Sequence, residues 1–573
     1  MNNSDTTAND INKHPIEQPH ETKPSRLLIP VALILILILA FYGYLIHQGL
    51  PQKWTEMSNI VHHEQTVHQG AEGDVSKQHP PYIMIAPFAA LLLAIAILPL
   101  IPATAHWWES NLSKFLIAAG LGVLTLLYYY FACDFPVEQH WPYHAMIDPA
   151  EHSSFVVAKT IFFNAIVFEF LPFIILLFSL FTITGGIRIG GNLKATPFVN
   201  SVILLVGAIL ASFIGTTGAA MLLIRLLLET NKERKYKVHT VVVFIFAVCN
   251  CGGCLTPLGD PPLFLGYLRG VDFTWTFNLW VEWTFVNLIL ITFYFLWDTV
   301  WFYWRESKED KKKDAANQTS ISISGWILNV PLLLGVVAAV AFLDPGKTLP
   351  GTDWHPWYYL REATQLGLAA ISLLFSSYII RKENVFNFLA IGEVAALFFG
   401  IFICMQAPLQ ILNLEGKNIV AHAEKATGLN KEKLFFWSSG SLSSVLDNAP
   451  TYVVFFETAK SLTPNTEAEL EADLNEDGSP KWKKEDTGQW KSTDGERKLV
   501  PVTNGFIEHV LLVAVALGSV FMGAMTYIGN GPNFMVKAIA EQDGVKMPSF
   551  FGYMLYSFLI LLPLLVAMTM IFL

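Results

Sequence analysis

The chain is poor in charged residues. Only 15% of its 573 residues are Asp, Glu, Lys or Arg, whereas 53% are hydrophobic, and the mean hydropathy is +0.44. Soluble globular domains carry about 25% charged residues, so this composition excludes that class and indicates a polytopic membrane protein. The 5 cysteines lie in or beside apolar segments, which argues against a secreted disulfide framework.

Features of enzymes and of nucleic-acid-binding proteins are also missing. No H-E-x-x-H motif or comparable catalytic cluster falls within an apolar segment, so we expect neither an embedded metalloprotease nor a cofactor. No basic patch marks a nucleic-acid partner, and the net charge of −10 reflects a few acidic loops. The first 25 residues lack the short apolar core of a removable signal peptide, so residues 27–46 are expected to be an uncleaved first span.

Apolar stretches long enough to cross a bilayer recur along the chain. A crossing helix needs about 20 predominantly apolar residues. Such stretches are 27–46, 81–102, 113–132, 155–185, 275–300, 326–343, 363–380, 387–410 and 549–572. Four further apolar segments are interrupted by Gly, Pro and polar residues, namely 196–230, 238–270, 436–460 and 505–540. The sequence therefore predicts an all-α polytopic membrane protein with about 11 transmembrane helices, two re-entrant hairpins and two broken helices.

The predicted domain organisation follows from these segments. A polar N-terminal tail (1–26) precedes N-terminal membrane helices that act as a scaffold (27–154) and a first inverted repeat (155–304). A cytoplasmic linker (305–325) leads to a second inverted repeat (326–573), and this repeat carries a hydrophilic insert at 461–500.

A pair of polar, helix-breaking motifs occurs once in each repeat. In the first, Gly-Thr-Thr-Gly at 215–218 is followed by a Gly- and Pro-rich run at 252–262. In the second, Asp-Asn-Ala-Pro-Thr at 447–451 is followed by a similar run at 523–532. Backbone inside a bilayer must satisfy its own hydrogen bonds, so such runs fit only where they are buried in protein or line a polar cavity. Two such pairs in corresponding positions are typical of a secondary transporter with its site at the bilayer midplane.

Basic residues in short loops set the expected orientation, because they favour the cytoplasm. Arg188 and Lys194 precede the 196–230 segment, and a second basic cluster at 232–237 follows it. Both clusters lie inside only if this segment turns at its tip and returns, and the second hairpin must then open to the outside. That arrangement is an inverted repeat, and we expect a multi-pass protein of the cell inner (cytoplasmic) membrane.

Hydroxyl and amide side chains concentrate in the interrupted segments. They are hard oxygen donors, suited to Na⁺ or to the polar groups of a substrate. The candidates are Thr216, Thr217, Asn250, Thr256, Asn448, Thr451, Thr526, Asn530 and Asn533. The alternative is that some of them only cap broken helices. Placing Gly259 on Gly529 pairs Thr256 with Thr526 and sets Asp260 against Asn530.

Two aspartates lie in these motifs. A carboxylate at membrane depth is a functional-site hypothesis by default, and Asp447 is predicted to be the decisive side chain, with Asp260 in the matching stretch of the other half. Desolvation raises a carboxyl pKa and a nearby cation lowers it, so one Asp can bind Na⁺ or a proton but not readily both. The hypothesis is a Na⁺ site at Asp447, Asn448 and Asp260. The alternatives are a helix cap for Asp447 and an Asp-Pro turn cap for Asp260.

Two glutamates occupy comparable places further upstream. Glu169 opens Glu-Phe-Leu-Pro-Phe and Glu393 opens Glu-Val-Ala-Ala-Leu, each in a helix two elements before its broken segment. Both are candidates for a proton route. Each could equally be the buried partner of a helix end.

The motifs at 252–262 (Gly-Gly-Cys-Leu-Thr-Pro-Leu-Gly-Asp-Pro-Pro) and 446–452 (Leu-Asp-Asn-Ala-Pro-Thr-Tyr) resemble those of the ion transporter superfamily. Within it, the chain is similar to the NhaD-type sodium:proton antiporters and to the citrate transporter group called CitMHS-like, over about residues 80–573. The resemblance implies a scaffold, two opposed hairpins, two broken helices and a homodimer that moves its substrate by an elevator-like displacement. Carboxylate-transporting relatives carry Ser-Asn-Thr at both tips, and this chain does not.

These observations together predict a sodium:proton antiporter, with Na⁺ and H⁺ as the transported or coupling ions. The alternative is a sodium- or proton-coupled citrate or carboxylate transporter, since a bound cation would neutralise an acidic tip. A passive channel lined by carbonyl groups uses the same chemistry and stays open as a third possibility. The expected partners are small ions, a carboxylate substrate in the alternative reading, the lipid bilayer and a second copy of the chain.

Overall fold

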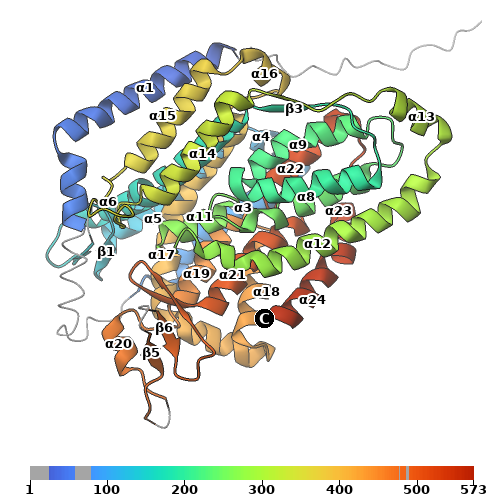
Figure 1. Ribbon diagram of the computed structural model, residues 1–573. Coiled ribbons are helices and arrows are strands. Elements are labelled where there is room, and N and C mark those ends of the chain that lie inside the picture. The colour runs from blue at the N-terminus through green and yellow to red at the C-terminus, as the bar shows by residue number, and fades with distance from the viewer. Residues whose placement is uncertain (1–24, 59–78, 143, 476–477, 486–488) are drawn as a thin grey trace, which may run out of the picture.

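The computed structural model describes residues 25–58, 79–142, 144–475, 478–485 and 489–573. Most of the described chain is helical, and short two-stranded ribbons lie at its edges (Figure 1). The predicted N-terminal tail lies almost entirely outside the described residues.

The helices of the first half run from α1 to α13. Their bounds are α1 (Ser25–His47), η1 (Tyr82–Ile85), α3 (Ala86–Ile97), η2 (Leu98–Leu100), α4 (Pro102–Trp108), α5 (Asn111–Phe131), α6 (Ser154–Phe163), the π-helix η3 (Asn164–Phe170), α7 (Leu171–Thr184), α8 (Pro197–Ile214), α9 (Thr216–Thr230), α10 (Val238–Ala247), η4 (Cys251–Cys254), α11 (Pro261–Leu268), η5 (Trp275–Leu279), α12 (Trp280–Trp297), η6 (Asp298–Phe302), η7 (Tyr303–Arg305) and α13 (Lys308–Ala316).

The helices of the second half run from α14 to α24. Their bounds are α14 (Trp326–Phe342), α15 (Leu360–Phe375), α16 (Tyr378–Glu383), α17 (Leu389–Thr427), α18 (Lys431–Ser443), α19 (Asn448–Lys460), α20 (Glu467–Ala472), α21 (His509–Met522), η8 (Gly523–Met525), α22 (Gly531–Gln542), α23 (Phe550–Tyr556), η9 (Ser557–Leu561) and α24 (Leu562–Phe572).

The strands pair only with their neighbours in antiparallel ribbons. These are β1 (Val137–Gln139) with β2 (Ala145–Ile147), β3 (Arg188–Gly190) with β4 (Ser322–Ser324), β5 (Trp482–Lys484) with β6 (Trp490–Ser492), and β7 (Leu499–Val502) with β8 (Gly505–Glu508). The β3–β4 ribbon and α13 lie at one end of the molecule, and the insert with β5 and β6 lies at the other (Figure 1).

Seven helical runs of the described residues are long and apolar enough to cross a membrane. They are Leu28–His47, Asn111–Phe131, Ser154–Thr184, Pro197–Ile214, Trp275–Arg305, Leu389–Thr427 and Phe550–Phe572. Shorter apolar helices at Val238–Cys254, Trp326–Phe342 and His509–Met525 add to them. The prediction of an all-α polytopic membrane protein is therefore confirmed.

The chain bends where one predicted span ends. The stretch expected to cross at 81–102 is helical from Tyr82 to Leu100, and a second helix, Pro102–Trp108, then continues at an angle of 102° to Tyr82–Ile97. Ile101 is extended, with φ −88° and ψ 118°. A residue before proline is driven out of the helical region, so Pro102 starts a new helix in another direction.

In the structure we use the name scaffold for α5, η3 and α17, which pack together, whereas the predicted scaffold comprised residues 27–154. α17 has 39 residues and packs along α5. The contact is closest at Gly400, where an added Cβ would lie 2.3 Å from the backbone oxygen of Ala118. Only glycine lets the two helices approach so closely.

Two helical hairpins and two discontinuous helices fill the space beside this scaffold. α8 and α9 are joined at Gly215, whose φ of 80° breaks the helix at the predicted tip. α18 and α19 are joined by residues 444–447. α10 is separated from α11 by a first break (residues 248–260), and α21 from α22 by a second break (residues 523–530).

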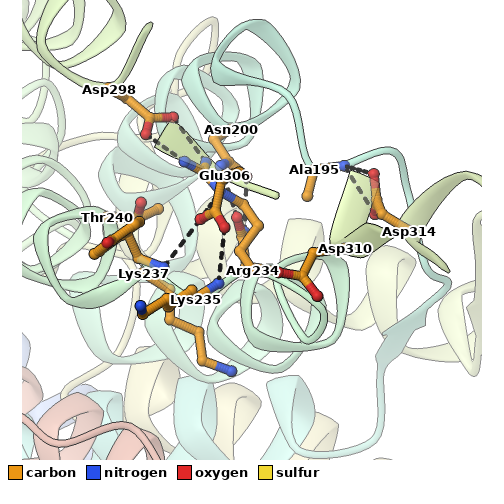
Figure 2. A network of polar contacts seen from close by, with 12 residues as sticks. Ala195, Asn200, Arg234, Lys235, Lys237, Thr240, Asp298, Glu306, Asp310 and Asp314 are labelled. Atoms are coloured by element: carbon orange, nitrogen blue, oxygen red, sulfur yellow. Dashed lines mark hydrogen bonds and ion pairs between the residues drawn. The ribbon is translucent and has the colours of Figure 1, made fainter. Parts of the chain in front are cut away.

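A buried polar network anchors the open end of the first hairpin (Figure 2). Arg234, just after α9, donates two hydrogen bonds to Asp298, at 2.8 and 2.6 Å, and its Nε lies 3.5 Å from Glu306. Glu306 also accepts from the backbone N–H groups of Lys235 and Tyr236 at 3.2 and 3.0 Å. Paired buried charges of this kind hold the hairpin end against η6 and η7. The hairpin tip is thereby positioned at the opposite end, beside the first break.

Candidate functional site

Each break folds back on itself at a pair of glycines. An added Cβ on Gly259 would lie 2.2 Å from the backbone oxygen of Gly253, and one on Gly529 would lie 2.6 Å from that of Gly523. Neither position has room for a side chain. The glycine spacing in the sequence therefore encodes the same compact turn in both halves.

A threonine fastens each break to its hairpin. The Thr256 hydroxyl donates to the backbone oxygen of Ser212 in α8, and the Thr526 hydroxyl donates to that of Ser444 at 2.5 Å. Each hydroxyl also accepts a hydrogen bond two residues on, from Leu258 N at 3.2 Å and from Ile528 N at 3.3 Å. Both threonine hydroxyls are therefore engaged in holding backbone together, the capping role that was the alternative for these residues.

Asp260 lies where the two halves meet. Its side chain is 1% exposed, and Oδ1 accepts hydrogen bonds from Thr216 Oγ1 at 3.0 Å and from Asn530 Nδ2 at 3.2 Å. Oδ2 accepts from the amide of Asn448. These three donors come from the tip of α9, the start of α22 and the start of α19. One carboxylate thus joins both hairpins and both breaks.

A chain of buried amides extends from this carboxylate. Asn530 Nδ2 also donates to the backbone oxygen of Cys249 at 3.0 Å, with Asn250 Oδ1 at 3.3 Å. Asn250 Nδ2 donates to Asn533 Oδ1 at 2.8 Å, and Asn533 Nδ2 donates to the backbone oxygens of Gly523 and Thr526 at 2.8 and 2.9 Å. The chain links the first break to the second.

Asn448 carries an oxygen without a hydrogen-bond partner among the described residues. The side chain is fully buried, its nitrogen donates to Asp260, and its Oδ1 accepts nothing. A buried polar atom without a partner is unfavourable by about 1–3 kcal/mol and calls for an explanation. An oxygen beside a buried carboxylate is the position in which a bound cation would supply the missing interaction.

Asp447 lies at the edge of this cluster rather than at its centre. It is half-buried at the N-terminus of α19, where its Oδ1 accepts from the backbone N–H of Ala449 at 3.2 Å. The contacts of Asp447 are those of a helix cap, which was the alternative reading for this residue. Thr451 Oγ1 donates to the Asp447 backbone oxygen at 3.1 Å, and the half-buried Thr217 takes no part in the contacts to Asp260 described above.

The two glutamates proposed for a proton route have basic partners. Glu169, in the π-helix η3, accepts from Arg269 Nη2 at 2.9 Å, and Arg269 Nε donates to Glu457 of α19 at 3.2 Å. Glu393 is half-exposed and lies 2.6 Å from Lys114 of α5. Both contacts are ion pairs, an arrangement that the sequence analysis did not name for these residues.

Arg269 is a residue that the sequence analysis missed. It follows α11 directly and joins η3 of the scaffold to α19 of the second hairpin. A basic residue at the C-terminal end of a short helix inside an apolar region was the available signal, since such a charge needs buried partners. Arg269 therefore connects the scaffold to the elements around Asp260.

Discontinuous helices that meet over a buried polar cluster, within a helical membrane protein, define the class of secondary transporters. The family described as "Putative citrate transport" matches residues 77–573 of the chain. The chain belongs to this family of membrane transporters. A comparison with curated proteins gives no match.

Proposed function

We propose that the protein is a secondary active transporter that exchanges Na⁺ for H⁺ at Asp260. The observation that carries this proposal is the set of contacts to one buried carboxylate: a hydroxyl from α9 and amides from α19 and α22. A carboxylate buried at membrane depth is expensive and marks the path of an ion.

The donors around Asp260 can become ligands by small rotations. An amide group offers a nitrogen donor on one side and an oxygen acceptor on the other. Turning the amides of Asn448 and Asn530 would present two oxygens beside the Asp260 carboxylate, and the Thr216 hydroxyl would add a third. Carboxylate, amide, hydroxyl and backbone oxygens are the ligands that hard cations prefer.

Competition at a single carboxylate is sufficient for exchange. A bound Na⁺ and a bound proton each neutralise the Asp260 charge, and the two exclude each other because they use the same oxygen atoms. The carboxylate then crosses between the two faces only in a neutral form. Inward movement of one ion is thereby coupled to outward movement of the other.

The second candidate is cation-coupled transport of citrate or another carboxylate. Membership of the citrate transport family favours it. So does the direction of the half-helices, because α9, α11, α19 and α22 all begin at residues of the Asp260 cluster or directly after them. Helix N-termini attract anions. In this reading Na⁺ on Asp260 would offset the repulsion between the carboxylate and an anionic substrate.

Transport by purified protein in lipid vesicles separates the two candidates. An imposed pH gradient should collapse when NaCl is added without citrate if the protein exchanges Na⁺ for H⁺. If the gradient persists and labelled citrate enters only in the presence of Na⁺ or of an imposed inward proton gradient, the second candidate is correct. Absence of both activities in vesicles that contain folded protein would refute both.

A further inference from the structure

Three metal-ligating side chains gather on the β1–β2 ribbon, away from Asp260. They are Glu138 of β1 and His140 and His144 of the loop that follows it, which we call the β1 site. Glu138 Oε1 lies 3.5 Å from His144 Nδ1 and 4.0 Å from His140 Nδ1. One ligand atom from each residue lies within 4.8 Å of the other two. Glu138 is half-exposed and leaves an entry path from solvent, whereas His144 is 5% exposed.

The scaffold holds the backbone of this site in place. Asn164, at the start of the π-helix η3, is buried, and its amide makes two hydrogen bonds, one to the backbone of β1 and one to the backbone of the residue after β1. Its Nδ2 donates to the backbone oxygen of Glu138 at 2.7 Å, and its Oδ1 accepts from the backbone N–H of His140 at 2.9 Å. The His140 ring also stacks on the Phe168 ring, with the ring centroids 5.7 Å apart. Two of the three ligands are therefore fixed by core residues, as a metal site requires.

A residue just after the insert contacts the same site. Asn504, in the turn between β7 and β8, donates to Glu138 Oε1 at 2.6 Å and lies 3.4 Å from His144 Nδ1. Its neighbour Thr503 donates its backbone N–H to the backbone oxygen of Arg269 at 2.8 Å. The turn thus connects the β1 site with the end of α11.

We propose that Glu138, His140 and His144 bind one Zn²⁺ ion. Two imidazole nitrogens and one carboxylate oxygen form a familiar zinc ligand set, with the fourth position left for water or for the Asn504 amide oxygen. Zinc holds these ligands at about 2.0–2.2 Å, which places them about 3.3 Å apart in a tetrahedron. The present separations, all of 4.8 Å or less, need only small side-chain movements to reach that geometry. The proposal does not depend on which ion the protein transports.

Binding of Zn²⁺ to the purified full-length protein tests the site. After removal of metal with a chelator, the wild type should bind one Zn²⁺ more tightly than the His140→Ala/His144→Ala variant does, by about 100-fold or more, since even loss of an outer partner weakens metal sites by 10–100-fold. Zn²⁺ should also raise the unfolding temperature of the wild type and not that of the variant. Glu138→Gln, which keeps the size of the side chain, should weaken binding without changing the metal-free unfolding temperature.

The matched control is His106→Ala. His106 is an exposed histidine whose Nδ1 lies 3.4 Å from Glu109. It therefore offers one histidine–glutamate pair, as the β1 site does, but without a second histidine. This variant should retain the wild-type Zn²⁺ titration in full. The proposal is overturned if the wild type has no such site, or if the double variant and Glu138→Gln, folded as judged by their metal-free unfolding, bind Zn²⁺ as the wild type does.

Discussion

The two broken helices, α10–α11 and α21–α22, are built alike and differ at one functional position. Both breaks turn on a close glycine pair and both are tied to a hairpin by a threonine hydroxyl. At the residue before the second half-helix, however, the α10–α11 helix has Asp260 and the α21–α22 helix has Asn530. The shared contacts are therefore structural, and in the proposed exchange mechanism the unshared charge of Asp260 binds the ion.

The difference also shows how the halves cooperate. Asn530 donates to Asp260, so the neutral member of the pair stabilises the charged member. Two acids at these positions would repel each other across the same short distance. In the proposed mechanism, the single acid of this pair and its matching amide bind one cation at a time.

The largest expected effect comes from removing the charge that distinguishes the halves. Asp260→Asn should reduce Na⁺ affinity by about 100-fold or more, because loss of one partner of a buried ion pair is destabilising by about 3 kcal/mol and each 1.4 kcal/mol is tenfold. Na⁺ binding to purified protein and Na⁺-driven transport in vesicles both measure it. Asp543→Asn, an exposed acid just after α22, is the control and should behave as wild type. Normal Na⁺ binding by Asp260→Asn would remove this carboxylate from the mechanism.

The next largest effect is expected at the close glycine pairs that both breaks share. Gly259→Ala and Gly529→Ala each place a Cβ against a carbonyl oxygen, at 2.2 and 2.6 Å, and each should destabilise the protein by about 1–3 kcal/mol. The first should be the more harmful because its contact is shorter. Thermal unfolding in detergent measures both. Gly531→Ala is the matched control, since nothing lies within 4 Å of its added Cβ. Unchanged unfolding temperatures for all three variants would show that the breaks are not tightly packed.

A smaller, symmetric effect is expected at the threonines. Thr256→Val and Thr526→Val each remove a hydroxyl that donates to a hairpin carbonyl, with an expected loss of about 1 kcal/mol in either half. The two unfolding temperatures should fall by similar amounts, and the Na⁺ affinity of the folded protein should be retained. A large loss of Na⁺ binding in only one of them would instead make that threonine a ligand and break the proposed equivalence.

The class of fold could be predicted from the sequence because its signals are local. Apolar run length predicts the crossing helices, and Gly and Pro predict where helices break, as at Gly215 and in the two breaks. The short helix Pro102–Trp108 was not predicted, because it lies beyond the end of the apolar run.

The centre of the site could be predicted only in part, because it depends on how short half-helices are rotated against one another. The motifs brought Asp260, Asn448 and Asn530 into consideration, but a single sequence does not show which acid faces the others. Long-range pairs were also out of reach. Lys114 joins Glu393 and Arg269 joins Glu169 across more than 90 residues of chain. The β1 site depends on a ribbon that residue spacing did not indicate.

The smallest expected effect is also the one that best separates the two aspartates. Asp447→Asn keeps a side chain that caps a helix about as well, so the stability of α19 should change by only a few tenths of a kcal/mol. If Asp447 only caps, Na⁺ affinity should stay within about threefold of wild type, the range that a few tenths of a kcal/mol allows. Asp447→Ala, which also loses the cap to Ala449, should lower the unfolding temperature while Na⁺ binding persists. Should Asp447→Asn instead abolish Na⁺ binding as Asp260→Asn does, both acids must hold the ion together, and the single charge that separates the two halves would no longer account for the site.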